Sequence, residues 1–440
     1  EPVCIAESTW TVMIYLNGDN DLDGWMAMLF NRLELAKVSD SSLVIRVLWD
    51  RSGNGDTVLY QVQPDNQMYA LGNYVEGETK WSQGELDMGD PATLQNFILN
   101  TTRDLPATYY LLAIVNHGGG WSPELYTPQR RSARHAAGAS GFSWDFTNAY
   151  NYLSTQDMGR VFSHTQLIDN PIDVVFYDAC LMGMLEEAYE VRRGARYLVA
   201  SQNETWTSFP YNEYLVGIGG RTPLVQVARM VDKYHLSLAS YPHTMAALDL
   251  QRTGEMSAAL DNLAIQLGEF VPTHTARIED VFLATQKLDY NYDLVISDTE
   301  GYVDLGDFSD GLVDEFSGTE LAEAATALRN ILDGFTNPMV IHERHGNGIA
   351  GWGGPDVDLT RVTGLSIYLP LGNDPEDLDL PFYVNSQLAL TNDTRWDEFI
   401  FHALGQPYPQ PPVSSPGGRG GRPQPLNKGR IFLPVVISGQ

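Results

Sequence analysis

Cysteine is scarce in this sequence, which has only Cys4 and Cys180 among 440 residues. Small secreted domains that depend on disulfides carry larger, even sets of cysteines, so this chain does not belong to that class. Two cysteines could still form one bridge. Cys4, however, lies close to the first residue, where chains are usually poorly ordered. The setting of Cys180 therefore decides whether its thiol is structural or reactive.

Basic residues are also few: the chain has 27 Lys and Arg and 56 Asp and Glu, which gives a formal net charge of −29. A surface this acidic repels nucleic-acid phosphates and anionic lipid headgroups, so neither is expected as a partner. It would attract basic peptides, although acidic surfaces commonly serve solubility alone. Apolar runs of about 18 residues are missing too, so no membrane-spanning helix is predicted.

Apolar, β-branched runs alternate with helical patterns in the first half of the chain. The predicted strands are 10–16, 42–50, 56–63, 109–116, 172–177 and 197–201, with helices over 22–38 and 91–99. Strands that alternate with helices predict an α/β fold with a mostly parallel sheet covered on both faces. Ligands bind such sheets beyond the carboxyl ends of the strands, so the loops there are the candidates for chemistry.

Pattern and composition divide the chain into five segments. They are an N-terminal segment 1–9, an α/β core 10–221, a largely helical portion 222–405, a linker 406–428 and an apolar tail 429–440. Short strands are predicted in the third segment at 244–249 and 364–369, and a helix at 396–404. The linker is rich in Pro, Gly and Arg, which is typical of a flexible connection.

A histidine and three glycines follow the predicted strand 109–116 in the segment Asn116-His-Gly-Gly-Gly-Trp121. Glycines let the backbone approach a substrate closely and turn its amides inward. His117 would therefore stand at a strand end beside oxyanion donors, where a general base is needed. The alternative is a structural histidine.

Cys180 follows the predicted strand 172–177 in the segment Asp178-Ala-Cys-Leu-Met-Gly183. A helical pattern comes next, and the partial positive charge of a helix N-terminus would favour the thiolate. The alternative is a buried structural cysteine. Together, however, a His and a Cys at two strand ends of one parallel sheet make the dyad of covalent acyl transfer.

Several ordered segments resemble the clostripain family of cysteine peptidases. They are Tyr15-Leu-Asn-Gly-Asp-Asn-Asp-Leu22, the His117 and Cys180 segments, Val199-Ala-Ser201, Gly301-Tyr-Val-Asp-Leu305, Gly364-Leu-Ser-Ile-Tyr-Leu-Pro370 and Trp396-Asp-Glu-Phe399. The likeness extends over about 8–405. It implies the caspase-like α/β/α fold that the family shares with legumains, gingipains and separases, with 10–221 as the catalytic core and 222–405 as the rest of the peptidase unit.

The resemblance also implies roles for single residues. Cys180 corresponds to the nucleophile and His117 to the base, while the amides of Gly118 and Cys180 would stabilise the oxyanion. Cleavage after Arg or Lys in the family is attributed to acids in the specificity pocket, and Asp178 matches one of them. Glu204 is the candidate for a second acid, although its surroundings depart from the family pattern. A helix cap or a surface charge is the alternative for Asp178.

Relatives in this family are often activated by cleavage between the His and Cys strands. The corresponding stretch 122–143 contains Arg130, Arg131 and Arg134 among Ser, Ala and Gly. Self-processing there is one interpretation, and an ordinary basic surface loop is the other.

A calcium site is considered because some relatives in this family require calcium. The segment Asp19-Asn-Asp-Leu-Asp-Gly24 begins like an EF-hand loop, but its twelfth position is Phe30 instead of Glu. We therefore expect these acids to cap the following helix and assign no metal ligand among them. No cofactor is expected to be required, and the acidity of the chain leaves a calcium site elsewhere open.

The resemblance makes peptides or proteins with basic residues the expected substrates. Two other functions remain, namely a catalytically silent surface protein that binds peptides and a peptidase with another specificity, such as Asn or Asp. Asp178 argues against Asp, because like charges would face each other. The proline-glycine linker and apolar end are similar to C-terminal segments of exported bacterial proteins, so we expect an extracytoplasmic bacterial protein, secreted or at the cell surface. The sequence defines no oligomeric state.

Overall fold

The computed structural model describes residues 8–40, 43–65, 79–121, 142–149, 151–238, 240–290, 295–349, 356–372, 380–385 and 387–409. Several features predicted from sequence lie outside these ranges. They are Cys4, the three arginines Arg130, Arg131 and Arg134, most of the linker 406–428, and the tail 429–440. No described helix is both long enough and apolar enough to cross a bilayer.

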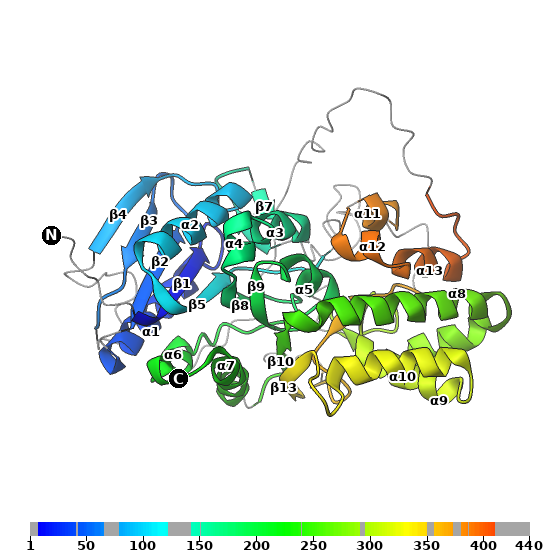
Figure 1. Cartoon of the computed structure of the whole chain (residues 1–440). Coiled ribbons are helices and arrows are strands. Elements are labelled where there is room, and N and C mark those ends of the chain that lie inside the picture. Colours follow the sequence, from blue (N-terminus) through cyan, green and yellow to red (C-terminus); the bar gives the residue numbers. More distant parts are fainter. Residues whose placement is uncertain are drawn as a thin grey trace, which may run out of the picture.

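A twisted sheet of nine strands lies at the centre of the described fold (Figure 1). Its strands are β1 (Ser8–Asn17), β2 (Val44–Asp50), β3 (Thr57–Gln61), β4 (Thr79–Gly84), β5 (Ala107–Val115), β8 (Ile172–Asp178), β9 (Ala195–Ala200), β10 (His243–Asp249) and β13 (Val340–Gly346). Their order is β13-β10-β9-β8-β5-β1-β2-β3-β4. The five strands from β9 to β2 are parallel, while β3, β4, β10 and β13 add antiparallel edges. The predicted, mostly parallel α/β sheet is confirmed at its centre.

Continuous apolar runs make the central strands, because a strand covered on both faces buries side chains on both. In β1 every residue from Val12 to Leu16 is fully buried, and the same holds in β5 from Leu112 to Ile114. The mostly helical pattern of the second half of the chain did not indicate β13. Both β10 and β13 belong to the nine-stranded sheet, so this sheet contains residues from before and after position 221.

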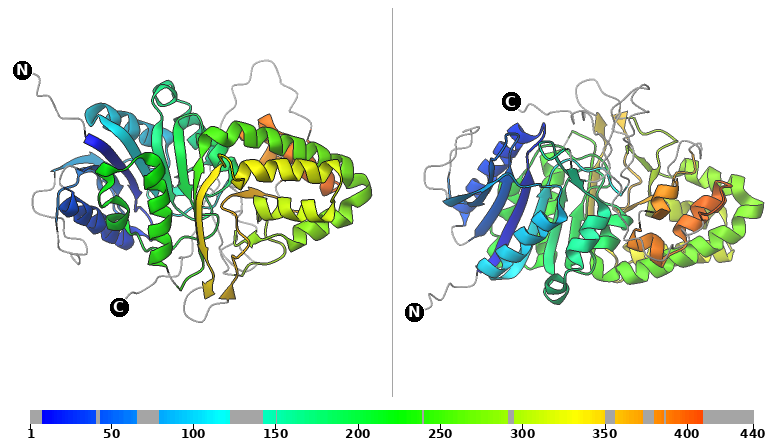
Figure 2. Two further views of the ribbon diagram at one scale, coloured as in Figure 1. Left: turned by 60° about the horizontal axis from the view of Figure 1, so that its bottom comes forward. Right: turned by 90° about the horizontal axis from the view of Figure 1, so that it is seen from above.

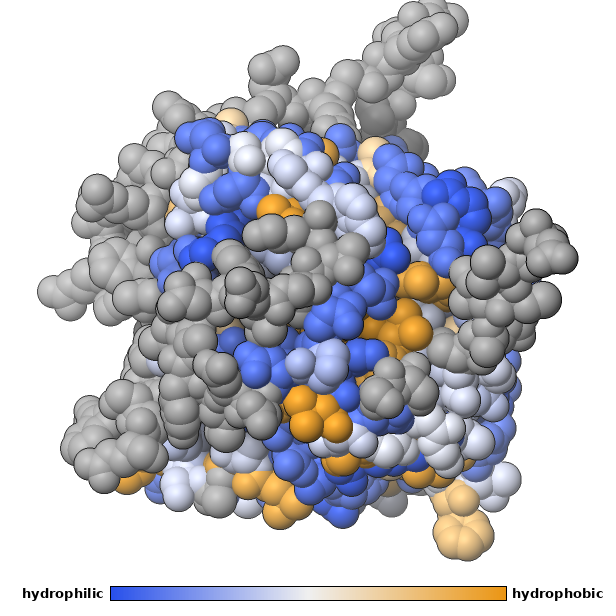
Figure 3. Space-filling view, turned by 90° about the vertical axis from the view of Figure 1, so that its left-hand side faces the viewer, coloured by the Kyte–Doolittle hydropathy of each residue, from blue (hydrophilic) through white to orange (hydrophobic). Residues whose placement is uncertain are grey.

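Helices cover both faces of the sheet (Figure 2). One face carries α1 (Asp23–Ser39), α6 (Tyr211–Leu215) and α7 (Pro223–Ser237), and the other carries α2 (Pro91–Asp104), α3 (Thr155–Phe162) and α5 (Leu185–Val191). The remaining helices of this half are α4 (Thr165–Asp169) and the 3₁₀ turns η2 (Ile218–Gly220) and η3 (Leu250–Arg252). On the side shown in Figure 3, apolar residues form small patches among hydrophilic ones.

The C-terminal portion packs at the β13 end of the sheet as helices and small sheets. Its helices are α8 (Thr253–Ala284), α9 (Leu305–Glu315), α10 (Glu320–Asp333), α11 (Leu380–Asn385), α12 (Ala389–Asp393) and α13 (Trp396–Ala403). Its small sheets are β11 (Lys287–Leu288), β12 (Tyr302–Asp304) and β16 (Ser366–Tyr368), and β14 (Gly348–Ile349) with β15 (Asp356–Val357). A further small sheet, β6 (Phe142–Asp145) with β7 (Asn151–Leu153), belongs to the N-terminal part of the chain. The Ser366 amide donates to the Gly183 carbonyl at 2.9 Å, so the C-terminal portion contacts the loop after β8.

Candidate active site

Three neighbouring strands end at the same level of the sheet. Leu16 of β1 pairs with Val115 of β5, which in turn pairs with Asp178 of β8. The loops that follow these strands therefore emerge side by side at the carboxyl edge, as expected for a parallel sheet. They carry Asp21, His117 and Cys180.

The His117 and Cys180 loops touch through their backbones at Gly118. A Cβ atom at this position would lie 2.3 Å from the Cys180 carbonyl oxygen and 3.1 Å from the Cys180 nitrogen. Only glycine fits there, because any side chain would have to displace the backbone that carries the thiol. The sequence prediction that one edge of the sheet brings both loops together agrees with this contact.

His117 pairs with an acid that the sequence prediction assigned to another role. Its Nε2 lies 2.8 Å from Oδ1 of Asp21, in the loop between β1 and α1. Burial alone would raise the pKa of Asp21, but the hydrogen bond and charge of His117 outweigh it and lower that pKa below its usual value. Asp21 thus has the position of the group that orients a catalytic imidazole.

The predicted capping role of the Asp19–Asp23 acids is wrong. The residue before α1 is Leu22, which makes no side-chain capping bond. Asp19 instead accepts from the Thr147 amide, and Asp23 from Arg51, although Asp23 does lie in the first turn. The three acids with EF-hand-like spacing therefore have three different partners: Thr147 for Asp19, His117 for Asp21 and Arg51 for Asp23.

Cys180 is only 6% exposed, and its thiol contacts Thr205. The Thr205 amide donates to Sγ at 3.2 Å, and the Thr205 hydroxyl lies 3.4 Å from it. Burial, with the nearby charge of Glu204, raises the pKa of the Cys180 thiol to about 12. The helix expected directly after Cys180 begins only at Leu185, and the direction of the pKa shift opposes the thiolate that a helix N-terminus would favour.

The residue after the nucleophile candidate adopts a strained backbone. Leu181 has a φ of 62°, in the left-handed region that residues with a Cβ avoid at a cost of roughly 1–3 kcal/mol. Two backbone bonds hold this turn, from Leu181 to the Asn203 carbonyl and from Gly183 to the Ser201 carbonyl. The loop after β9 therefore fixes the shape of the loop after β8.

Asp178 is buried at the end of β8 beside the thiol loop. The Tyr211 hydroxyl donates to its Oδ2 at 3.0 Å. Burial raises the pKa of Asp178 to about 7, and the bond from Tyr211 partly offsets this. The alternative of a helix cap is excluded, because the residue that precedes α5 is Met184. Glu204 also lies close enough for its charge to act on Cys180.

Comparison with known proteins agrees with this geometry. The sequence profile of the clostripain family matches residues 14–402. The chain belongs to the clostripain family. Clostripain from Hathewaya histolytica is 26% identical in an alignment 305 residues long that covers 58% of this chain and 56% of clostripain, so the chain spans about half the length of that relative.

Two solved structures have the same fold as this clostripain-family chain. An inactive zymogen C11 protease from Parabacteroides distasonis is 19% identical, with a TM-score of 0.62 over 88% of this chain and 98% of its own. A secreted C11 cysteine protease from Bacteroides thetaiotaomicron, in complex with an irreversible peptide inhibitor, is 17% identical, with a TM-score of 0.62 over 88% and 99%. The fold expected from the resemblance is confirmed, and the family is one of cysteine peptidases.

The C-terminal portion of this clostripain-family chain supports the triple-glycine loop. The Tyr302 hydroxyl donates to the Gly119 carbonyl at 2.8 Å, and Gly120 has a φ of 72° with Tyr302 and Met184 directly against it. Trp121 packs edge-on against Tyr368 and Tyr383. No motif points to these contacts, because residues far apart in the sequence make them.

Proposed function

We propose that this chain is a cysteine endopeptidase that cleaves after Arg or Lys, with Cys180 as the nucleophile and His117 as its base. The contact between Gly118 and the backbone of Cys180 carries this proposal, because it brings the imidazole loop and the thiol loop to one place. The imidazole is held by Asp21, and the acid Asp178 lies two residues before the thiol.

The reaction needs one proton shuttle and one covalent intermediate. His117 accepts the thiol proton while Sγ of Cys180 attacks the scissile carbonyl carbon, and the carbonyl oxygen becomes an oxyanion. The C–N bond then breaks as His117 returns the proton to the leaving amine, which leaves a thioester. Water, deprotonated by His117, attacks the thioester, and the thiol leaves with a proton.

The amides of Gly118 and Cys180 are the proposed donors to the oxyanion. Both belong to the two loops that meet at the carboxyl edge, and both backbones are fixed by the contact at Gly118. Loss of one such donor typically lowers kcat by roughly 10²–10³-fold. A preorganised amide costs nothing to reorient during the reaction, so rigidity here favours the transition state.

A substrate must displace part of the loop after β9 before the thiol can react. In the structure Thr205 contacts Sγ, and burial with the charge of Glu204 keeps the pKa of the thiol near 12. Entry of a cationic side chain would offset the Glu204 charge and give Asp178 a partner of opposite charge. The cation would therefore lower the cost of ionising the thiol, which ties specificity to activation.

Substrate preference rests on Asp178 and Glu204 as the acids of the specificity pocket. A buried carboxylate selects a cation because its charge is poorly screened there, and two carboxylates would favour the fork of Arg over Lys. Peptides and proteins with basic residues are therefore the proposed partners. Arg130, Arg131 and Arg134 make the stretch 122–143 a proposed site of self-processing, and we propose an extracytoplasmic location.

The test compares fluorogenic peptides that end in Arg, Lys, Asn or Asp, with wild type, Cys180→Ala, His117→Ala and the control Cys4→Ala. We expect cleavage after Arg or Lys by wild type and the control, and no detectable turnover by the other two variants. A peptidyl electrophile should label Cys180 only. Cleavage by Cys180→Ala would refute the mechanism, and folded protein that neither cleaves nor is labelled would support the silent peptide-binding alternative.

A further inference from the structure

Asn116 is buried at the carboxyl end of β5, directly before His117, and is only 4% exposed. Its backbone amide donates to the Asp178 carbonyl at 3.4 Å, where β8 ends two residues before Cys180. The amide group of its side chain has one acceptor and two donors, and such a group costs free energy if it is buried without partners. The partners of this side chain therefore show what holds the His117 loop in place.

The side chain of Asn116 bonds to three different segments of the chain. Its Nδ2 donates to the Asn17 carbonyl at 2.9 Å, at the end of β1, and to the Trp144 carbonyl at 3.3 Å, near the end of β6. Its Oδ1 accepts from the His117 amide at 2.5 Å. Together with the main-chain bond to Asp178, this one residue joins the ends of β1, β5, β6 and β8.

The chemistry of these partners requires asparagine at position 116. The carbonyls of Asn17 and Trp144 need donors, whereas the His117 amide needs an acceptor. A side-chain amide offers both, and the two carbonyls fix which end of it is the nitrogen. An ionised aspartate has nearly the same shape but only accepts, so it would leave both carbonyls facing another acceptor.

The Trp144 carbonyl also accepts from two asparagines that precede Asp21. Asn17 and Asn20 each donate to it from Nδ2 at 3.0 Å. Asn20 stands directly before Asp21, and its Oδ1 accepts from the amide of Leu22, directly after Asp21, at 2.9 Å. Three side-chain amides therefore meet at one backbone oxygen, so the loop that carries Asp21 and the end of β5 share one anchor.

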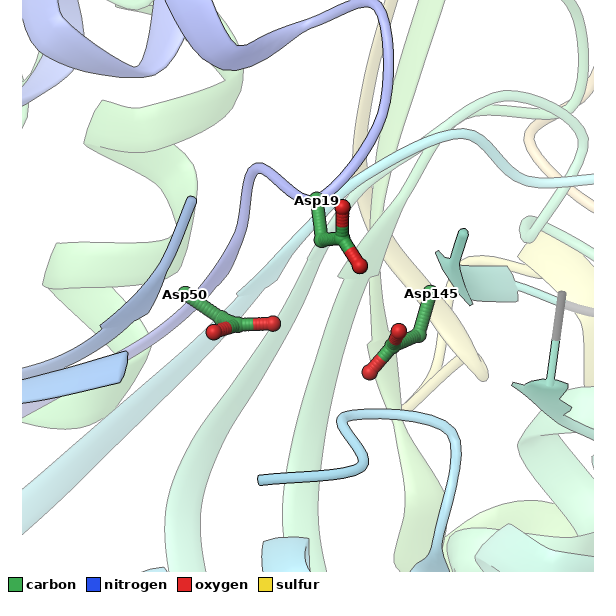
Figure 4. Close-up of side chains that lie close together, drawn as sticks. All are labelled: Asp19, Asp50 and Asp145. Atoms are coloured by element: carbon green, nitrogen blue, oxygen red, sulfur yellow. The ribbon is translucent and has the colours of Figure 1, made fainter. Parts of the chain in front are cut away.

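The segment after β6 is bonded to the same loop. Asp19 accepts from the Phe146 amide through its carbonyl at 3.0 Å and from the Thr147 amide through its carboxylate at 2.6 Å. Asp19 and Asp145 lie close together as a result, and Figure 4 shows their carboxylates gathered with that of Asp50 at this edge of the sheet. The loop after β1 is therefore held against the end of β6 over several residues.

We propose that Asn116 is a positioning residue, whose side chain sets how the imidazole of His117 meets Asp21. Nε2 of His117 lies 2.8 Å from Oδ1 of Asp21, although the two residues belong to separate loops. Asn116 links these loops directly, since it bonds the Asn17 carbonyl and the His117 amide at once. Its effect on turnover rests on the proposed function, whereas its effect on the bond between His117 and Asp21 does not.

The test variant is Asn116→Asp, which keeps the shape of the side chain and removes both of its donors. Its matched control is Gln286→Glu, the same chemical change in the C-terminal portion. Gln286 is also buried, and its Nε2 donates to the Lys287 and Asp358 carbonyls at 3.0 Å each. Its Oε1 accepts from the Arg361 amide at 3.4 Å. A loss that comes only from removing two buried donors should therefore appear in both variants.

Two readouts separate a positioning role from a structural one. Crystal structures in the Cys180→Ala background, which prevents self-processing, give the distance between Nε2 of His117 and Oδ1 of Asp21 without any need for activity. Steady-state kinetics of the enzyme with Cys180, on an Arg substrate, compare Asn116→Asp, Asp21→Asn and the double variant. Thermal melts identify any variant that has lost its fold, and Asn116→Ala, which leaves room for water, is the second variant.

We expect Asn116→Asp to move the two atoms beyond hydrogen-bonding distance. It should lower kcat roughly 10–100-fold at nearly constant KM, because small misplacements of a reacting group cost about that much. The double variant should be little slower than Asp21→Asn alone, since both changes break the same pair. Gln286→Glu should keep both the bond and the rate.

The positioning role would be overturned by a retained bond in Asn116→Asp, by a raised KM at constant kcat, or by losses that multiply in the double variant. If neither Asn116 variant folds, Asn116 is a structural residue and the positioning role is rejected as well. If wild type cleaves none of the peptides, the proposed function fails, and the crystal structures alone decide the role of Asn116.

Discussion

Nε2 of His117 lies 2.8 Å from Oδ1 of Asp21, and the two residues follow adjacent parallel strands. Because β5 lies between β1 and β8, the imidazole can face the acid on one side and the thiol loop on the other. This order resembles an acid, an imidazole and a nucleophile in series, the arrangement that orients a catalytic base.

Asp21→Asn should lower kcat roughly a hundredfold and leave KM nearly unchanged, because Asp21 acts on substrate only through His117. Asp21→Glu should recover part of the loss. Asp23→Asn is the matched control, since Asp23 lies in the same region but pairs with Arg51. Steady-state kinetics with an Arg substrate decide the matter, and a raised KM at constant kcat would rule out a positioning role.

Gly118→Ala should reduce kcat/KM roughly a hundredfold or more, because the new Cβ would meet the Cys180 carbonyl oxygen at 2.3 Å and displace the oxyanion donors. Gly254→Ala in α8 is the control, since a Cβ there meets nothing within 4 Å. Melting curves should accompany the kinetics, so that lost activity is separated from lost fold. Wild-type activity in Gly118→Ala would contradict the backbone contact.

Activity on Arg substrates should rise as Asp178 ionises. Burial raises the pKa of Asp178 to about 7, so its carboxylate forms between about pH 6 and 8 and then attracts the cation. KM for an Arg substrate should fall across this window, and Asp178→Asn should remove the trend and raise KM by roughly 10–100-fold. Asp173→Asn, at the other end of β8, is the control. An Asp178→Asn enzyme that keeps the wild-type KM would exclude Asp178 from the pocket.

Stability should fall as pH rises above about 5, partly through Glu187. Burial raises the pKa of Glu187 to about 8, well above its usual value near 4.3. Between these values the folded state binds more protons than the unfolded state, so the free energy of unfolding falls with rising pH. In thermal melts from pH 5 to 8.5, the Tm of Glu187→Gln should fall less than that of wild type. The Tm of the control Glu269→Gln, at an exposed position, should fall as much as that of wild type.

The residues that follow strong strand signals were the predictable part of the site. His117 and Cys180 could be placed at strand ends because β5 and β8 are largely apolar runs, and three glycines follow His117. The partner of His117 could not be found in this way, because strand order is set by tertiary packing and β1 lies far from β5 in the sequence. The raised pKa of the Cys180 thiol was missed for a similar reason, since burial and the residues Thr205 and Glu204, which reach Cys180 from the loop after β9, depend on tertiary packing.

The position of β5 between β1 and β8 also determines what a cut within 122–141 would produce. Such a cut leaves His117 on one polypeptide and Cys180 on the other, yet β5 stays hydrogen-bonded to strands of both. Trp121 stays packed against Tyr368 and Tyr383, and Phe142 stays bridged to Gly118. The product would be an interlocked heterodimer, in which neither polypeptide can leave until the sheet itself unfolds.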